Sequence, residues 1–81
     1  MQINIYAFRD AKSENLTIPF YMQNDAMAQR AFADMVNDPE HQFGKNPEDY
    51  TLVKLGTYDD NDGTLYSDME IVTDGLDLIR R

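Results

Sequence analysis

Few residues of this chain could do chemistry: a single histidine, His41, and a run of carboxylates in Asp59-Asp60-Asn61-Asp62-Gly63. Cysteine is absent, which excludes disulfide bonds and thiolate metal ligands. Asp38 and Glu40 flank His41, but a catalytic or metal-binding histidine needs convergent partners that the sequence does not supply. We therefore predict that His41 is a solvated or loop-bracing residue.

The acidic run resembles a calcium-binding loop in composition only. If Gly63 took the sixth position of an EF-hand loop, the first and twelfth positions would be Tyr58 and Met69, which carry no carboxylate. Asp62-Gly63 is instead typical of a tight β-hairpin turn. Nucleophile motifs and glycine-rich phosphate loops are also missing, so we predict a non-enzymatic protein with no catalytic residues, metal or other cofactor.

The 81 residues are enough for a single domain, residues 1–81, with one small core. Alternating side chains predict four strands, at residues 2–8, 16–22, 50–58 and from 64 towards 72. Pro19 cannot donate a ladder hydrogen bond, which predicts an edge strand or a local irregularity there. The third strand is apolar on both faces, which is typical of a central strand, and Gly56 within it suggests a bulge.

A helix is predicted between the second and third strands. Its apolar positions recur with helical spacing from Met27 to Val36, around Phe32 as the expected central core residue. Asn24 or Asp25 can cap its start, and Pro39 ends it. Residues 38–49 are expected to form a long loop, and residues 73–81 fit either a short helix or an edge strand. The prediction is an α+β fold, in which a small antiparallel sheet of three to four strands, in the order β-β-α-β-β, carries one main helix on one face.

Because one helix covers one face of a sheet, we expect the other face to carry aromatic side chains: Tyr6, Phe8, Tyr21 and either Tyr58 or Tyr66. Proteins that bind single-stranded DNA stack bases on exposed aromatic rings beside cationic side chains. The predicted nucleic-acid-binding residues are Tyr6, Phe8, Arg9, Lys12, Tyr21 and Lys54. The alternative is that the aromatic residues belong to the core or to the interface of a homodimer.

The net charge of −8 is unevenly distributed along the chain. Seven of the 15 acidic residues lie between Lys54 and Arg80, a stretch with no lysine or arginine. An acidic chain is a poor general binder of polyanions, whereas carboxylates on a hairpin can meet a basic surface of another protein. The predicted partner-binding residues are His41, Phe43, Asp59, Asp60 and Asp62.

Several ordered motifs also carry a family resemblance. They are Asn4-Ile5-Tyr6, Asp10-Ala11-Lys12, Pro19-Phe20, Arg30-Ala31-Phe32, Val36-Asn37-Asp38-Pro39, Pro47-Glu48-Asp49-Tyr50-Thr51-Leu52 and Leu55-Gly56-Thr57-Tyr58-Asp59-Asp60. In their order and spacing the chain resembles the small nonstructural protein of gokushoviruses, which are single-stranded-DNA phages of the microvirus family. The resemblance covers most of residues 4–61 and is weak from Asp62 onward.

The resemblance implies a non-capsid protein made in the cytoplasm of the infected bacterium. It also implies DNA binding, the activity commonly assigned to this family, and a role in viral DNA replication or in the switch to single-strand synthesis. The first functional hypothesis is therefore a non-enzymatic phage protein that binds single-stranded DNA through the aromatic face. The second is an acidic homodimeric protein-interaction module that engages a host or phage replication protein without touching DNA.

Overall fold

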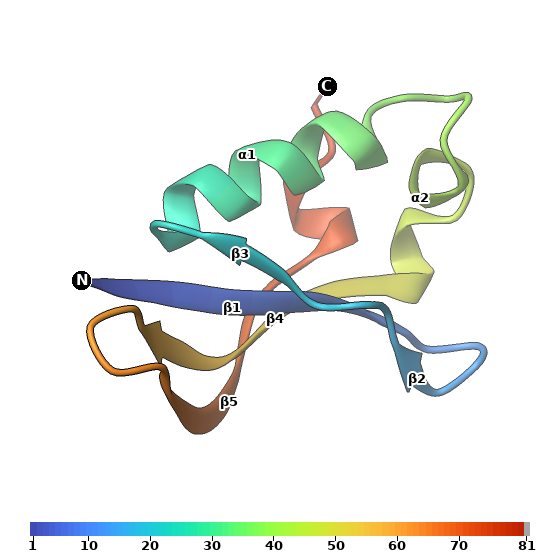
Figure 1. Ribbon diagram of the computed structural model, residues 1–81. Helices are drawn as coiled ribbons and strands as arrows, with labels where there is room; N and C mark the ends of the chain where they lie inside the picture. The colour runs from blue at the N-terminus through green and yellow to red at the C-terminus, as the bar shows by residue number, and fades with distance from the viewer. Residues whose placement is uncertain (81) are drawn as a thin grey trace.

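The computed structural model describes residues 1–80 and has an α+β fold in which α1 lies across a five-stranded antiparallel sheet (Figure 1). This confirms the predicted fold class. The elements, in chain order, are β1 (Gln2–Asp10), β2 (Asn15–Leu16), β3 (Phe20–Met22), α1 (Asp25–Val36), α2 (Gln42–Lys45), the 3₁₀ helix η1 (Pro47–Asp49), β4 (Tyr50–Asp59), β5 (Thr64–Asp74) and the 3₁₀ helix η2 (Gly75–Leu78).

The sheet is organised around β1 and β4, which pair along almost their whole lengths. On its other side, β1 pairs with both β2 and β3, and β5 pairs with β4 at the far edge. The prediction that the strand beginning at Tyr50 is central is therefore confirmed. β5 is the longer of the two sheet edges, because β2 and β3 together contribute only short segments.

The predicted strand at residues 16–22 is split into β2 and β3 around Pro19, which confirms the predicted irregularity. Leu16 pairs with Arg9 whereas Phe20 pairs with Tyr6, so the pairing shifts by one residue across the split. The Phe8 N–H donates to Thr17 Oγ1 at 3.0 Å, and the Thr17 N–H donates to the Phe8 carbonyl at 2.8 Å. The shift places Leu16 and Phe20 on opposite faces of the sheet, because neighbouring positions alternate between faces.

Helix α1 begins and ends as its sequence indicates. Asn24 Oδ1 accepts a hydrogen bond from the Met27 N–H at 2.9 Å, which caps one of the unpaired amides of the first turn. At the other end, the Asn37 side chain donates to the carbonyls of Ala33 and Leu78, at 2.7 and 2.9 Å, and ties α1 to η2. Phe32 is completely buried, so the prediction that it is central to the core is confirmed.

The face of β1 that α1 covers is the opposite of the one expected. Tyr6 and Phe8 point towards α1 and belong to the core, with 0% and 7% of their surfaces exposed. The Phe8 ring centroid lies 5.1, 4.9 and 4.9 Å from those of Phe20, Phe32 and Phe43. The prediction that Tyr6 and Phe8 lie on the uncovered face is wrong, because their large rings fill the space between helix and sheet.

Residues 38–49 form compact structure and not the long loop that was expected. His41 Nδ1 accepts a hydrogen bond from the Phe43 N–H at 3.0 Å and caps α2, which confirms its loop-bracing role. The buried ring of Phe43 lies 4.1 Å from that of Tyr50, between centroids, and closes one end of the core. Burial of this one ring anchors a segment whose helices are too short to show a periodic pattern.

The β4–β5 hairpin contains the predicted bulge at Gly56. Its pairing register shifts between Lys54 and Gly56, and Gly56 adopts φ = +154°. A Cβ atom on Gly56 would lie 1.8 Å from the Tyr66 carbonyl oxygen, so only glycine fits this close approach. Beyond β5, the chain turns into η2, which resolves the predicted ambiguity in favour of a short helix; Arg81 lies outside the described residues.

Replacement of Phe32 by alanine is expected to lower the free energy of unfolding by about 3–5 kcal/mol, because it removes a fully buried ring from the core. Urea denaturation followed by circular dichroism measures this loss. Met27→Ala, on the exposed side of the same helix, is the matched control and should change stability by less than about 0.5 kcal/mol. Equal effects of the two substitutions would contradict this assignment of the core.

Candidate functional site

The six predicted nucleic-acid-binding residues do not converge on one surface. Tyr6 and Phe8 are in the core, and Tyr6 pairs across the sheet with Lys54, so Lys54 also lies on the side of α1. Arg9 and Tyr21 lie on the other side of the sheet. Both lysines already form ion pairs: Lys12 Nζ lies 3.2 Å from the Asp49 carboxylate, and Lys54 Nζ lies 3.6 Å from that of Glu70.

The Tyr6 hydroxyl has a structural role at the start of α1. It donates to Asp25 Oδ1 at 2.5 Å and accepts from Asn4 Nδ2 at 2.9 Å, which links β1 to the first turn of the helix. Burial of the ring, followed by the hydrogen bond to Asp25, raises the pKa of Tyr6 to about 12. The neutral phenol is therefore the form that the folded protein favours.

The sheet face away from α1, here called the open face, is mainly apolar. Because paired residues share a face, the register places nine apolar side chains there: Ile3, Ile5, Ala7, Leu16, Tyr21, Val53, Tyr58, Leu65 and Ile71. Ala7 and Val53 at its centre are buried, whereas Tyr21, Leu65 and Ile71 are exposed, Ile71 by 72%. Figure 1 shows the β4–β5 hairpin curving away below β1, on the side opposite α1.

The open face carries little charge and contains an aromatic pair. The rings of Tyr21 and Tyr58 meet edge to face with centroids 6.1 Å apart. Beside them is a shallow hollow of about 260 Å³, whose lining includes Ile5 and Leu65. The charged residues that the register places on this face, Arg9 and Asp74, both lie level with Thr51, at one end of it. This arrangement suits contact with another apolar surface or with flat rings.

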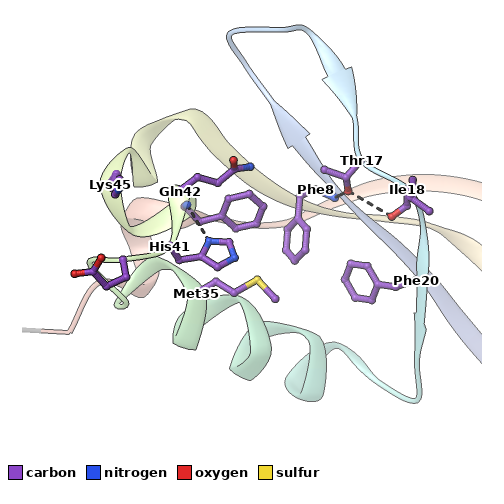
Figure 2. A pocket seen from close by; sticks show the side chains of 10 residues that line it. Phe8, Thr17, Ile18, Phe20, Met35, His41, Gln42 and Lys45 are labelled. Carbon is purple, nitrogen blue, oxygen red and sulfur yellow. Dashed lines mark hydrogen bonds between the residues drawn. The ribbon is translucent and has the colours of Figure 1, made fainter.

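A second surface is the groove between the Thr17–Phe20 segment and the helices α1 and α2 (Figure 2). Its volume is about 890 Å³, within the range of ligand-binding clefts. Phe8, Phe20, Met35 and Phe43 form its apolar lining, and Ile18, the most exposed large apolar residue of the described chain, lies beside it. Figure 2 shows Phe8, Phe20 and Met35 around the same space.

The rim of this groove is polar and includes His41. Glu40, His41, Gln42 and Lys45 surround the apolar lining, so both acidic and basic groups are present. The groove therefore brings together two of the predicted partner-binding residues, His41 and Phe43, although Phe43 is buried and contributes mainly to its floor. An apolar side chain of a partner protein could enter the apolar floor of the groove, while polar groups beside it meet the rim. Neither the exposure of Ile18 nor the helical turn at Gln42 has a sequence signal, because the first depends on the break at Pro19 and the second is too short to show a periodic pattern.

The three predicted partner-binding aspartates lie in or beside the turn between β4 and β5, where they also stabilise its backbone. Asp59 accepts from the Asn61 N–H at 3.0 Å, and Asp60 pairs with the amino group of Met1 at 2.8 Å. Hydrogen bonds from Thr64 lower the pKa of Asp62 below its usual value. Within residues 1–80, no cluster of three or more His, Asp or Glu side chains could hold a metal ion. The turn is thus a braced acidic surface.

Replacement of Tyr6 by phenylalanine is expected to lower the free energy of unfolding at pH 7 by about 1.5–3 kcal/mol, since it removes a hydrogen bond to a carboxylate. The raised pKa of Tyr6 stabilises the wild type fully below pH 10, and this stabilisation is lost as the pH rises towards 12. Urea denaturation measures the free energy of unfolding at each pH. Between pH 7 and pH 11 this free energy should fall less for Tyr6→Phe than for wild type. The exposed Tyr66→Phe is the control and should behave as wild type.

Comparison with known proteins identifies the family to which the chain belongs. Residues 3–78 match the phage ORF5 protein family, which confirms that this is a phage protein. No curated protein and no solved structure matches the chain. In the described part of the chain, none of the helices has the length and apolar character needed to cross a membrane. Since the match spans nearly the whole sequence, the chain belongs to the phage ORF5 protein family.

Proposed function

We propose that this phage protein is a non-enzymatic, homodimeric protein-interaction module that engages a host or phage replication protein in the cytoplasm of the infected bacterium. The open face supports this proposal most directly. It presents exposed Tyr21, Leu65 and Ile71 beside half-buried Ile3 and Ile5, and its few charges lie at one end. A contiguous apolar surface of this kind is typical of a protein–protein interface.

A second copy of the chain is the best occupant of the open face. Each copy carries a net charge of −8, so two copies meet with least repulsion through a surface that is nearly free of carboxylates. A standard interface buries about 800 Å² on each partner, which is about 15% of this chain's 5351 Å² surface. The dimer would also provide a second layer for a sheet that α1 covers on one side only.

The role in viral DNA replication rests on the resemblance to the gokushovirus nonstructural protein. A protein-binding role is compatible with the charge of the chain, because a net −8 repels DNA phosphates but can attract a basic surface of a replication protein. The groove at His41 and the acidic turn at Asp59–Asp62 remain exposed when the open face is occupied, because neither contributes residues to that face. They are therefore the surfaces left for the replication protein.

The dimer is testable by light scattering on a size-exclusion column at micromolar concentration. Wild type should have the mass of a dimer, and Ile71→Asp should weaken the dimer about 10- to 100-fold, since symmetry buries the new carboxylate twice. Leu76→Asp, at an exposed apolar position in η2 and off the open face, should leave the dimer intact. A monomeric wild type at tens of micromolar would refute the proposed dimer.

Single-stranded DNA binding is the second candidate, favoured by the Tyr21–Tyr58 pair and by Arg9 on the same face. Bases could stack on Tyr21, the more exposed of the two rings, while Arg9 meets a phosphate. This site replaces the one built on Tyr6 and Phe8, whose burial removes them from any such surface. It uses the same face as the dimer, so the two functions compete.

Fluorescence anisotropy of a labelled oligothymidine, at about 50 and 200 mM salt, separates these candidates. The protein-interaction proposal predicts no binding at tens of micromolar protein, because the acidic chain repels the phosphates. Saturable binding that Tyr21→Ala abolishes, and that the control Ile18→Ala preserves, would establish the DNA-binding function in its place. A steep salt dependence would then assign the affinity to Arg9, and a shallow one to stacking.

A further inference from the structure

The free edge of β5 is a second unpartnered feature, distinct from the open face. β5 pairs with β4 on one side, and no backbone hydrogen bond outside that ladder involves Leu65–Ile71 within residues 1–80. All seven residues from Leu65 to Ile71 are exposed. The edge at β2 and β3 differs, because the Thr17–Pro19 segment interrupts it and Pro19 has no N–H to donate. The β5 edge is therefore the one that can accept another strand.

The β5 edge is also acidic. Asp68 and Glu70 lie within its exposed stretch, Asp74 ends the strand, and the turn before it carries Asp59–Asp62. Glu70 meets Lys54 at 3.6 Å, whereas no cation within the described residues pairs with Asp68. No lysine or arginine lies between Lys54 and Arg80, and within residues 1–80 the amino group of Met1, beside Asp59 and Asp60, is the one further cation that pairs with a carboxylate of this segment.

These charges decide which strand the edge can accept. Pairing with β5 of a second copy would bring the carboxylates of two identical acidic strands together, and like charges on neighbouring strands are destabilising. The register shift between Ser67 and Glu70 interrupts the ladder with any added strand, so it is the charges and not the bulge that distinguish one incoming strand from another. A strand that carries lysine or arginine instead gains from the same carboxylates.

We propose that the free edge of β5 is a docking site for an extended cationic segment of the partner protein, which adds to the sheet as a further strand. The inference rests on the proposed protein-interaction function but does not require the dimer. Backbone hydrogen bonds would supply the pairing, and the alternating side chains its specificity. On the side of α1 the added strand meets Glu70, and on the open face it meets Leu65 and Ile71. The matching segment therefore alternates basic and apolar residues.

The test uses a fluorescein-labelled peptide of alternating lysine and valine, about ten residues long, titrated into the full chain. We expect saturable binding in the micromolar range and slower exchange of the amide protons of Leu65–Ile71, measured by NMR. A peptide with the same charges but N-methylated backbone amides cannot form a strand ladder and should bind at least tenfold more weakly. Equal binding of the two peptides would overturn the proposal, because it would show electrostatic attraction without strand pairing.

Matched variants locate the site on the protein. Asp68→Lys combined with Glu70→Lys should weaken peptide binding at least tenfold, whereas Asp77→Lys, exposed in η2, should leave it within twofold of wild type. Loss of binding in Asp77→Lys, or slower exchange elsewhere than on β5, would refute the assignment to this edge. Slow exchange of Leu65–Ile71 that depends on protein concentration without peptide, and that persists in Ile71→Asp, in which the open-face dimer is weakened, would assign the edge to a second copy instead.

Light scattering on the same samples keeps the two proposals separate. A dimer that does not bind the lysine–valine peptide would refute the docking edge and leave the proposed dimer in place. A monomer that binds the peptide through β5 would refute the dimer and support the docking edge.

Discussion

The packing of the aromatic side of β1 against α1 is the contact on which the rest of the structure depends. Phe8 lies at its centre and contacts Phe20 from the neighbouring strand, Phe32 from α1 and Phe43 from α2. Three segments that are distant in sequence therefore converge on one ring. Because each aromatic side chain buries a large area, about 150–250 Å², this side of β1 provides more of the driving force for helix packing than the side of Ile3 and Ile5.

The same contact creates the surfaces that are available for function. Once α1 occupies the aromatic side, the aliphatic side has no second layer within the described residues, and Leu65 and Ile71 remain exposed on it. Most of this face is free of charge, because Glu70 lies on the side of α1, the acidic turn lies beyond the sheet, and Arg9 and Asp74 lie at one end of the face. The result is an apolar face bordered by an acidic strand edge, two surfaces suited to different partners.

Local signals were sufficient to predict most of the elements. The Asn24 cap, the break at Pro19, the bulge at Gly56 and the turn at Asp62-Gly63 all depend on short-range backbone geometry, which a few neighbouring residues determine. The compact region between Asp38 and Asp49 was missed for a related reason. A four-residue helix shows no periodicity, and burial of the Phe43 ring against distant residues holds it in place.

The sequence by itself determined the α+β class, the order of the elements and the concentration of acidic residues near the C-terminal strand, because alternation, capping and charge are local properties. Only the tertiary structure decided which face of β1 meets the helix. Both faces of that strand are apolar. The alternation of Ile3 and Ile5 with Tyr6 therefore assigns these residues to two different faces but does not indicate which face the helix covers. That choice depends on rings contributed by β3, α1 and α2, and it moved Tyr6 and Phe8 from the predicted binding surface into the core.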